Sequence, residues 1–152
     1  MDKRINDKQD ILKNILYISV NLDSDSKQQL ETFFKEHNRW KTENIKLLCH
    51  HMTISFHTII TYSISDYTFK NLGKTKDLKV VGYGFSEKAF AVLIDTDVPS
   101  TNNKKHVTCA INLDNGGKPV DSNSIENWEM LQPKDRFKLK GVVTINYKNK
   151  RT

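Results

Sequence analysis

The chain has 152 residues, of which 37% are hydrophobic and 28% are charged, so its length suits a single domain spanning residues 1–152. Its 24 Lys and Arg outnumber its 18 Asp and Glu, and the net charge of +6 favours a polyanionic partner such as RNA or a nucleotide. No stretch approaches the roughly 18 apolar residues of a membrane-spanning helix, so no membrane association is expected. The sequence indicates no obligate protein partner.

The first 13 residues are polar and predict a leader ahead of the folded part. Alternating and helix-periodic apolar residues then predict a strand at 16–22, a helix at 23–38, strands at 47–58, 79–85, 90–95 and 105–113, a short helix at 122–128 and a strand at 137–147. The stretch 59–67 either extends the preceding strand or forms a loop, and 70–79 is expected to be an exposed basic loop. This order predicts an α+β fold with mainly antiparallel pairing.

Two tripeptides of the same pattern begin two of these strands: His51-Met52-Thr53 and His106-Val107-Thr108. In a strand, residues i and i+2 point to the same face, so each histidine is expected to project beside its own threonine. The residues between them are apolar and face the core. The sequence therefore predicts two imidazoles and two hydroxyls on one polar sheet face, which is the set that metal-free phosphodiester chemistry requires.

Other interpretations of these residues remain open. Two solvated histidines on edge strands would also satisfy the pattern. A zinc site is conceivable, although its candidate ligands alternate between faces and lack a C-x-x-C pair: Cys49, His50, His51, His106 and Cys109. Strand alternation places Cys49 on the His51 face and turns His50 toward the core or the back face of the sheet. The two cysteines, with no apolar signal segment after Met1, predict a reducing, cytoplasmic location without a disulfide.

From about residue 17 to residue 147, the chain resembles the two-histidine (2H) phosphoesterase superfamily, which is defined by paired H-x-[ST] motifs. The resemblance rests on both motifs and on the segments 80–84, 89–92 and 116–123. It is nearest to cyclic phosphodiesterase domains of the fungal tRNA-ligase type and to small viral or phage members. It implies a bilobal α+β fold, with two mainly antiparallel sheets around a central cleft and flanking helices.

The resemblance further implies a hydrolase that needs no metal and no cofactor, with His51, Thr53, His106 and Thr108 as its catalytic residues. One imidazole would act as base and the other as acid, and the threonines would hold the phosphate oxygens. Which histidine is the acid stays open. The implied substrates are nucleotide phosphodiesters: cyclic oligonucleotide signals, 2′-5′ oligoadenylates, or RNA ends with a 2′,3′-cyclic phosphate. A viral or phage member of this kind would destroy host defence nucleotides in the host cytoplasm.

Four further residues are candidates for substrate binding. Tyr17 and Trp128 could stack on bases, and Lys105 and Lys118 flank the second motif and could hold phosphates. The alternatives are that the aromatic residues belong to the core and that the lysines lie in solvated loops. The alternative function is a non-catalytic RNA- or nucleotide-binding module of the same fold.

Overall fold

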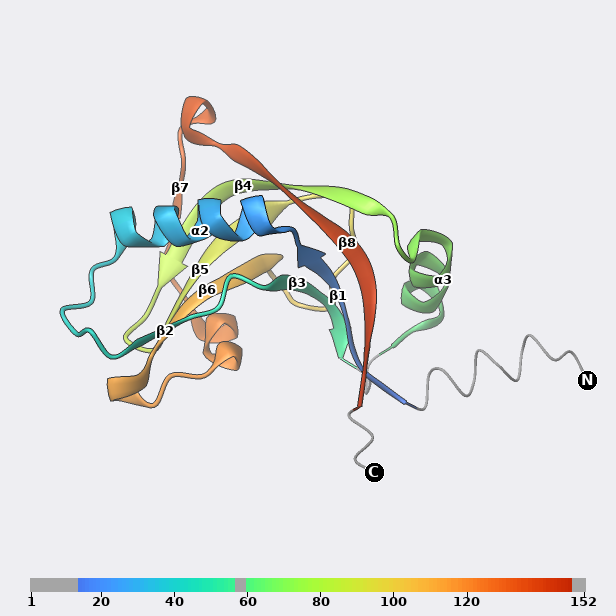
Figure 1. Ribbon diagram of the computed structural model, residues 1–152, viewed down its shortest axis with the longest axis horizontal. Helices are drawn as coiled ribbons and strands as arrows, with labels where there is room; N and C mark the ends of the chain where they lie inside the picture. Colours follow the sequence, from blue (N-terminus) through green and yellow to red (C-terminus); the bar gives the residue numbers. More distant parts are fainter. Residues whose placement is uncertain (1–13, 57–59, 149–152) are drawn as a thin grey trace, which may run out of the picture.

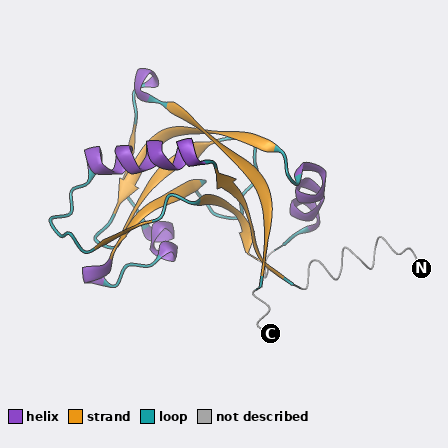
Figure 2. Cartoon of the chain, viewed as in Figure 1, coloured by secondary structure: helices purple, strands orange, loops and turns teal. Residues whose placement is uncertain are grey.

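The computed structural model describes residues 14–56 and 60–148 and is dominated by β-strands (Figures 1 and 2). The predicted leader 1–13 lies outside the described residues. The strands are β1 (Ile15–Leu22), β2 (Ile45–Leu47), β3 (His51–Phe56), β4 (Thr75–Phe85), β5 (Ala89–Asp95), β6 (His106–Asn112), β7 (Trp128–Met130) and β8 (Phe137–Tyr147). The helices are α2 (Ser24–His37), α3 (Tyr62–Asn71) and the short 3-10 turns η2 (Leu113–Asn115), η3 (Pro119–Ser124) and η4 (Pro133–Asp135).

Six of the strands form a closed antiparallel barrel. The neighbour order is β6-β3-β1-β8-β4-β5, and β5 pairs again with β6, which closes the ring. β2 extends the sheet beside β6, and β7 pairs with β4 outside the ring. Every pairing among these strands is antiparallel.

The expected bilobal α+β fold with two sheets around a central cleft is therefore wrong. That expectation interpreted the separation between the two motifs along the chain as a separation between two lobes. In the structure the motif strands β3 and β6 are direct neighbours, joined at Met52 and Val107. One continuous sheet carries both motifs, and β6 links the two ends of that sheet.

The interior of the barrel is filled by apolar side chains. Strand β8 alternates strictly, and β1 and β3 alternate over part of their length. The side chains of Val20, Met52 and Val143 are buried and pack in the core. Helix α2 lies across the barrel (Figure 1) and inserts Phe33 and Phe34 among the core aromatic residues. The outward face of β3 and β6 is left for polar side chains.

The local predictions differ from the structure mainly between the two motifs. The stretch 59–67, expected as strand or loop, contains most of α3, whose N-cap is Thr61; its side chain accepts from the backbone N–H of Ile64. Part of the expected basic loop at 70–79 belongs to β4. The short helix expected at 122–128 is the 3-10 turn η3, which begins earlier, at Pro119. Across the described ranges, the structure contains no helix with the length and apolarity needed to cross a membrane.

Candidate active site

The two H-x-T tripeptides lie side by side on antiparallel strands. Met52 of β3 pairs with Val107 of β6, so the flanking residues run in opposite directions along the two strands. Upstream of His51 the register is irregular, because the Thr108 carbonyl accepts from the backbone N–H of Cys49 over 3.1 Å. The Met52–Val107 pair thus brings the two tripeptides next to each other.

All four motif side chains line one cavity of about 480 Å³ on the outside of the barrel. Met52 and Val107, between them, are fully buried in the core. We call this space the motif cavity. Its apolar wall comes from Leu48, Phe56, Pro119 and Val120, and its remaining lining from Tyr17, His50, Asn102, Lys118 and Asn123. The predicted polar face is thus a concave site in which a ligand can contact both histidines.

His51 is held as a neutral imidazole. Its ring stacks on Tyr17, with ring centroids 5.0 Å apart and an interplanar angle of 30°. Burial, followed by the charges of His50 and His106, lowers the pKa of His51 from 6.5 to about 4. At neutral pH this ring has a free lone pair and can accept a proton.

His106 is oriented by the backbone. Its Nδ1–H donates to the carbonyl oxygen of Lys104 over 2.8 Å, because a carbonyl can only accept. This contact fixes the tautomer and leaves Nε2 as the ring nitrogen available for chemistry. Burial lowers the pKa of His106 below its usual value, and the hydrogen bond to Lys104 opposes that effect by favouring the protonated ring.

The two threonines have different surroundings. The Thr108 hydroxyl lies 2.7 Å from the hydroxyl of Ser122, which is buried on η3. The Thr53 hydroxyl makes no hydrogen bond within the described residues, whereas its backbone carbonyl accepts from Ser100 Oγ over 2.8 Å. Both hydroxyls line the motif cavity, where they can donate to the non-bridging oxygens of a phosphate.

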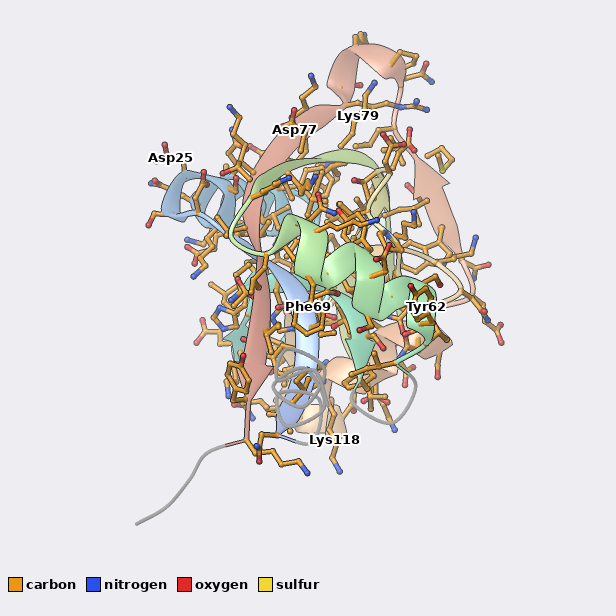
Figure 3. The ribbon with its side chains drawn as sticks, turned by 90° about the vertical axis from the view of Figure 1, so that its right-hand side faces the viewer. Asp25, Tyr62, Phe69, Asp77, Lys79 and Lys118 are labelled. Atoms are coloured by element: carbon orange, nitrogen blue, oxygen red, sulfur yellow. The ribbon has the colours of Figure 1, made fainter. Side chains whose placement is uncertain are left out.

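The structure brings two of the four predicted substrate-binding residues into the motif cavity. Tyr17 contacts His51 there, and Lys118 lies on its rim, near the lower end of the molecule in Figure 3. Trp128 lines a neighbouring cavity, with its ring centroid 6.5 Å from that of His106. Lys105 lies outside both cavities, because its Nζ donates to the carbonyl of Thr96 over 2.8 Å.

The sequence reasoning missed several residues of the site. Phe56, Asn102, Ser122 and Asn123 all reach the cavities beside the motifs. For Ser122 and Asn123 a signal existed, since they belong to the polar run after Gly117, which was interpreted as a helix start and as part of the family resemblance but not as part of the site. Asn102 sits in the loop before β6, and no periodic pattern marks its direction.

The alternation of β3 does not extend upstream of His51. Cys49 has a left-handed backbone, with φ of 57°, and its side chain is fully buried, with Sγ 3.4 Å from the carbonyl oxygen of Cys109. The predicted directions of Cys49 and His50 are therefore wrong: Cys49 enters the core, and His50 is exposed at the motif cavity. Among the described residues no group of three or more His, Cys, Asp or Glu side chains is arranged to hold a metal ion.

A larger cavity, of about 920 Å³, lies elsewhere, between α2 and the start of β8. It contains none of the motif residues. Carboxylates of Asp25, Glu36 and Asp135 line it, so its charge disfavours a phosphate. In Figure 3, Asp25 and Lys118 lie at well-separated positions, which places this cavity away from the motif cavity.

No family model matches the chain, and no curated protein matches its sequence. The resemblance to the 2H superfamily therefore stays a prediction.

Proposed function

We propose that the chain is a metal-independent phosphodiesterase that hydrolyses nucleotide phosphodiesters at the motif cavity. The observation that carries the proposal is the cavity itself, which gathers two imidazoles and two hydroxyls from antiparallel neighbouring strands. A general base, a general acid and two donors for phosphate oxygens are the groups that a phosphodiester hydrolysis uses.

In the proposed reaction His51 is the base and His106 the acid. Neutral His51 takes a proton from water as the water oxygen bonds to phosphorus. The bond from phosphorus to the leaving oxygen breaks, and protonated His106 donates its Nε2 proton to that oxygen. The low pKa of His51 supports its assignment as the base. At His106 burial lowers the pKa, and the hydrogen bond to the Lys104 carbonyl opposes part of this effect by favouring the protonated ring. The products are a phosphomonoester and an alcohol.

Nucleotides fit this site better than other phosphodiesters for two reasons. Tyr17 and Phe56 supply aromatic surface in the motif cavity, and base stacking on such surface is favourable for every base. Lys118 adds a positive charge at the rim for a phosphate. A substrate of this class, together with two buried free cysteines, is consistent with action in the cytoplasm, which would be the host cytoplasm for a viral protein.

The test is turnover of a panel of substrates by wild type, His51→Ala and His106→Ala. The panel contains cyclic dinucleotides and trinucleotides, 2′-5′ oligoadenylates and nucleoside 2′,3′-cyclic phosphates, with products identified by mass. Because general acid–base catalysis contributes about 10²- to 10⁴-fold, each variant is expected to lose activity by about that factor. Circular dichroism must show that both variants remain folded, and EDTA is expected to leave wild-type activity unchanged.

Two lysines provide a matched pair for this test. Lys118→Ala is expected to raise KM, because the rim of the motif cavity loses its positive charge. Lys105→Ala is expected to leave KM unchanged, since the Lys105 ammonium is held by the Thr96 carbonyl. Full activity in either alanine variant of the histidines, or complete loss of activity with EDTA, would refute the proposal. Binding of a panel member without any product would instead identify a non-catalytic binding module.

A further inference from the structure

A second cavity adjoins the motif cavity on the far side of His106. It has a volume of about 380 Å³, and we call it the asparagine cavity. The two cavities share Asn102, His106 and Asn123 as lining residues. Each has a size in the range of small-ligand sites, and the side chain proposed to act as acid stands between them.

The asparagine cavity combines a flat aromatic surface with unused amide groups. The Trp128 indole is fixed, because its Nε1–H donates to the Ile125 carbonyl over 3.2 Å. Within the described residues, the side-chain amides of Asn102, Asn103 and Asn123 make no hydrogen bond, although all three line the cavity. An amide offers both donors and an acceptor, so it can pair with the edge of any base.

A buried hydroxyl in the same wall also lacks a partner. Thr101 Oγ1 is inaccessible to solvent and has no hydrogen-bond partner among the described residues. The loop that carries it is tied to the first motif strand, since the Thr101 backbone N–H donates to the Ile54 carbonyl over 2.8 Å. Ile54 directly follows Thr53 on β3. This hydrogen bond therefore fixes the position of the asparagine cavity relative to Thr53.

We propose that the asparagine cavity binds a second nucleoside, so that the substrate is a phosphodiester linking two nucleosides. The inference rests on the proposed function for the position of the reacting phosphate, between the two cavities. One nucleoside lies in the motif cavity against Tyr17 and Phe56, and the other stacks on Trp128 with its base edge toward the asparagine amides. The preferred substrates are then oligonucleotide linkages, and a single nucleoside 2′,3′-cyclic phosphate is a poor one.

The kinetic test uses a dinucleoside monophosphate and two analogues in which a methyl group replaces one or the other nucleoside. Base stacking on an aromatic side chain predicts that Trp128→Ala lowers kcat/KM for the dinucleoside substrate about tenfold or more. It should leave kcat/KM unchanged for the analogue that lacks the nucleoside of the asparagine cavity. Phe56→Ala is the matched control, because of the two cavities Phe56 lines only the motif cavity. It should lower kcat/KM for the analogue that keeps the nucleoside of the motif cavity, and leave kcat/KM unchanged for the analogue that lacks that nucleoside.

A binding experiment separates this inference from the proposed catalysis. The chain has two tryptophans, so in a Trp40→Phe, His51→Ala variant the only indole is Trp128. The dinucleoside monophosphate and one of the two methyl analogues are expected to quench its fluorescence, and the other analogue is not. Quenching of this kind without wild-type turnover would support two-nucleoside binding and overturn the catalytic proposal. Binding without quenching, no binding, or equal kinetic effects of Trp128→Ala on all three probes would overturn the inference.

Discussion

At the scale of single residues, the two histidines have the same chemistry but different settings. The His51 ring is stacked on Tyr17 and makes no hydrogen bond to the backbone of the described residues, whereas the Lys104 carbonyl accepts from Nδ1 of His106. Both are buried enough that their pKa values fall below 6.5. In the proposed reaction His51 is the base that stays neutral, and the hydrogen bond to the Lys104 carbonyl opposes the effect of burial on the acid, His106.

This difference predicts an acidic pH optimum for hydrolysis. Activity should rise with pH as His51 loses its proton, near its pKa of about 4, and should fall as His106 loses its proton at a pKa below 6.5. A profile of log kcat/KM against pH is thus expected to be bell-shaped, with its maximum below pH 6.5. A maximum above pH 7 would contradict the assignment of acid and base.

The sequence was sufficient to predict which motif residues share a face, because residues two apart within each tripeptide point to the same side of the strand. It was not sufficient for Cys49 and His50, since the left-handed backbone at Cys49 interrupts that alternation. The direction of Lys105 was equally hidden: its partner, the Thr96 carbonyl, lies nine residues away in the turn after β5.

At the scale of elements, the segment after β6 depends on one close backbone contact. Gly117 N–H donates to the Asn112 carbonyl, and a Cβ at Gly117 would lie 2.3 Å from the Lys88 carbonyl oxygen. No side chain fits there without moving the backbone. The position of η3, which brings Ser122 to Thr108, depends on this contact.

Gly117→Ala is therefore expected to displace η3 and to lower kcat/KM by at least about tenfold, since a misplacement of about 1 Å can cost more than that. Gly116→Ala is the control: a Cβ there meets nothing within 4 Å, and its φ of 66° adds only local strain. That variant should lose about 1–2 kcal/mol of stability and keep its activity. Equal activity of the two variants would show that η3 does not position the site.

Element prediction failed where side chains act locally. Helix α3 is short and weakly amphipathic, and its start depends on the Thr61 cap rather than on an apolar stripe. Thr68 is buried on α3, and its hydroxyl donates to the Ile64 carbonyl. A polar residue therefore occupies a buried position that the helical periodicity of apolar residues would assign to an apolar side chain. The strands β1 and β8 were predicted almost to their ends, and the alternation of β8 is clear in its burial.

At the scale of the whole molecule, closure of the barrel brings the motifs together. Strands β3 and β6 pair at Met52 and Val107, and both side chains are fully buried. Closure of this kind could not be predicted from the sequence, because it depends on which strands meet over long separations. The spacing of the motifs was compatible with two lobes as well as with one ring.

Met52→Ala should weaken this closure. Removal of a fully buried methionine side chain is expected to lower the free energy of unfolding by about 2–5 kcal/mol, as measured by urea denaturation. Met130→Ala provides the control, because Met130 is 58% exposed on β7 and outside the ring; its effect should stay within about 0.5 kcal/mol. Similar losses from both variants would argue against a closed core at this pair.

The single Met52–Val107 pair also gives the two tripeptides an approximate twofold relation. A half-turn about an axis through that pair exchanges His51 with His106 and Thr53 with Thr108. The four motif residues alone would therefore accept a phosphodiester in either of two opposite orientations. Only the asymmetric surroundings distinguish them: Tyr17 beside one histidine, and the Lys104 carbonyl with Trp128 beside the other. The residues around the two histidines thus determine which side of the phosphodiester faces His51 and which faces His106. Substitutions of these surrounding residues are expected to reverse that orientation without any change to the four motif residues.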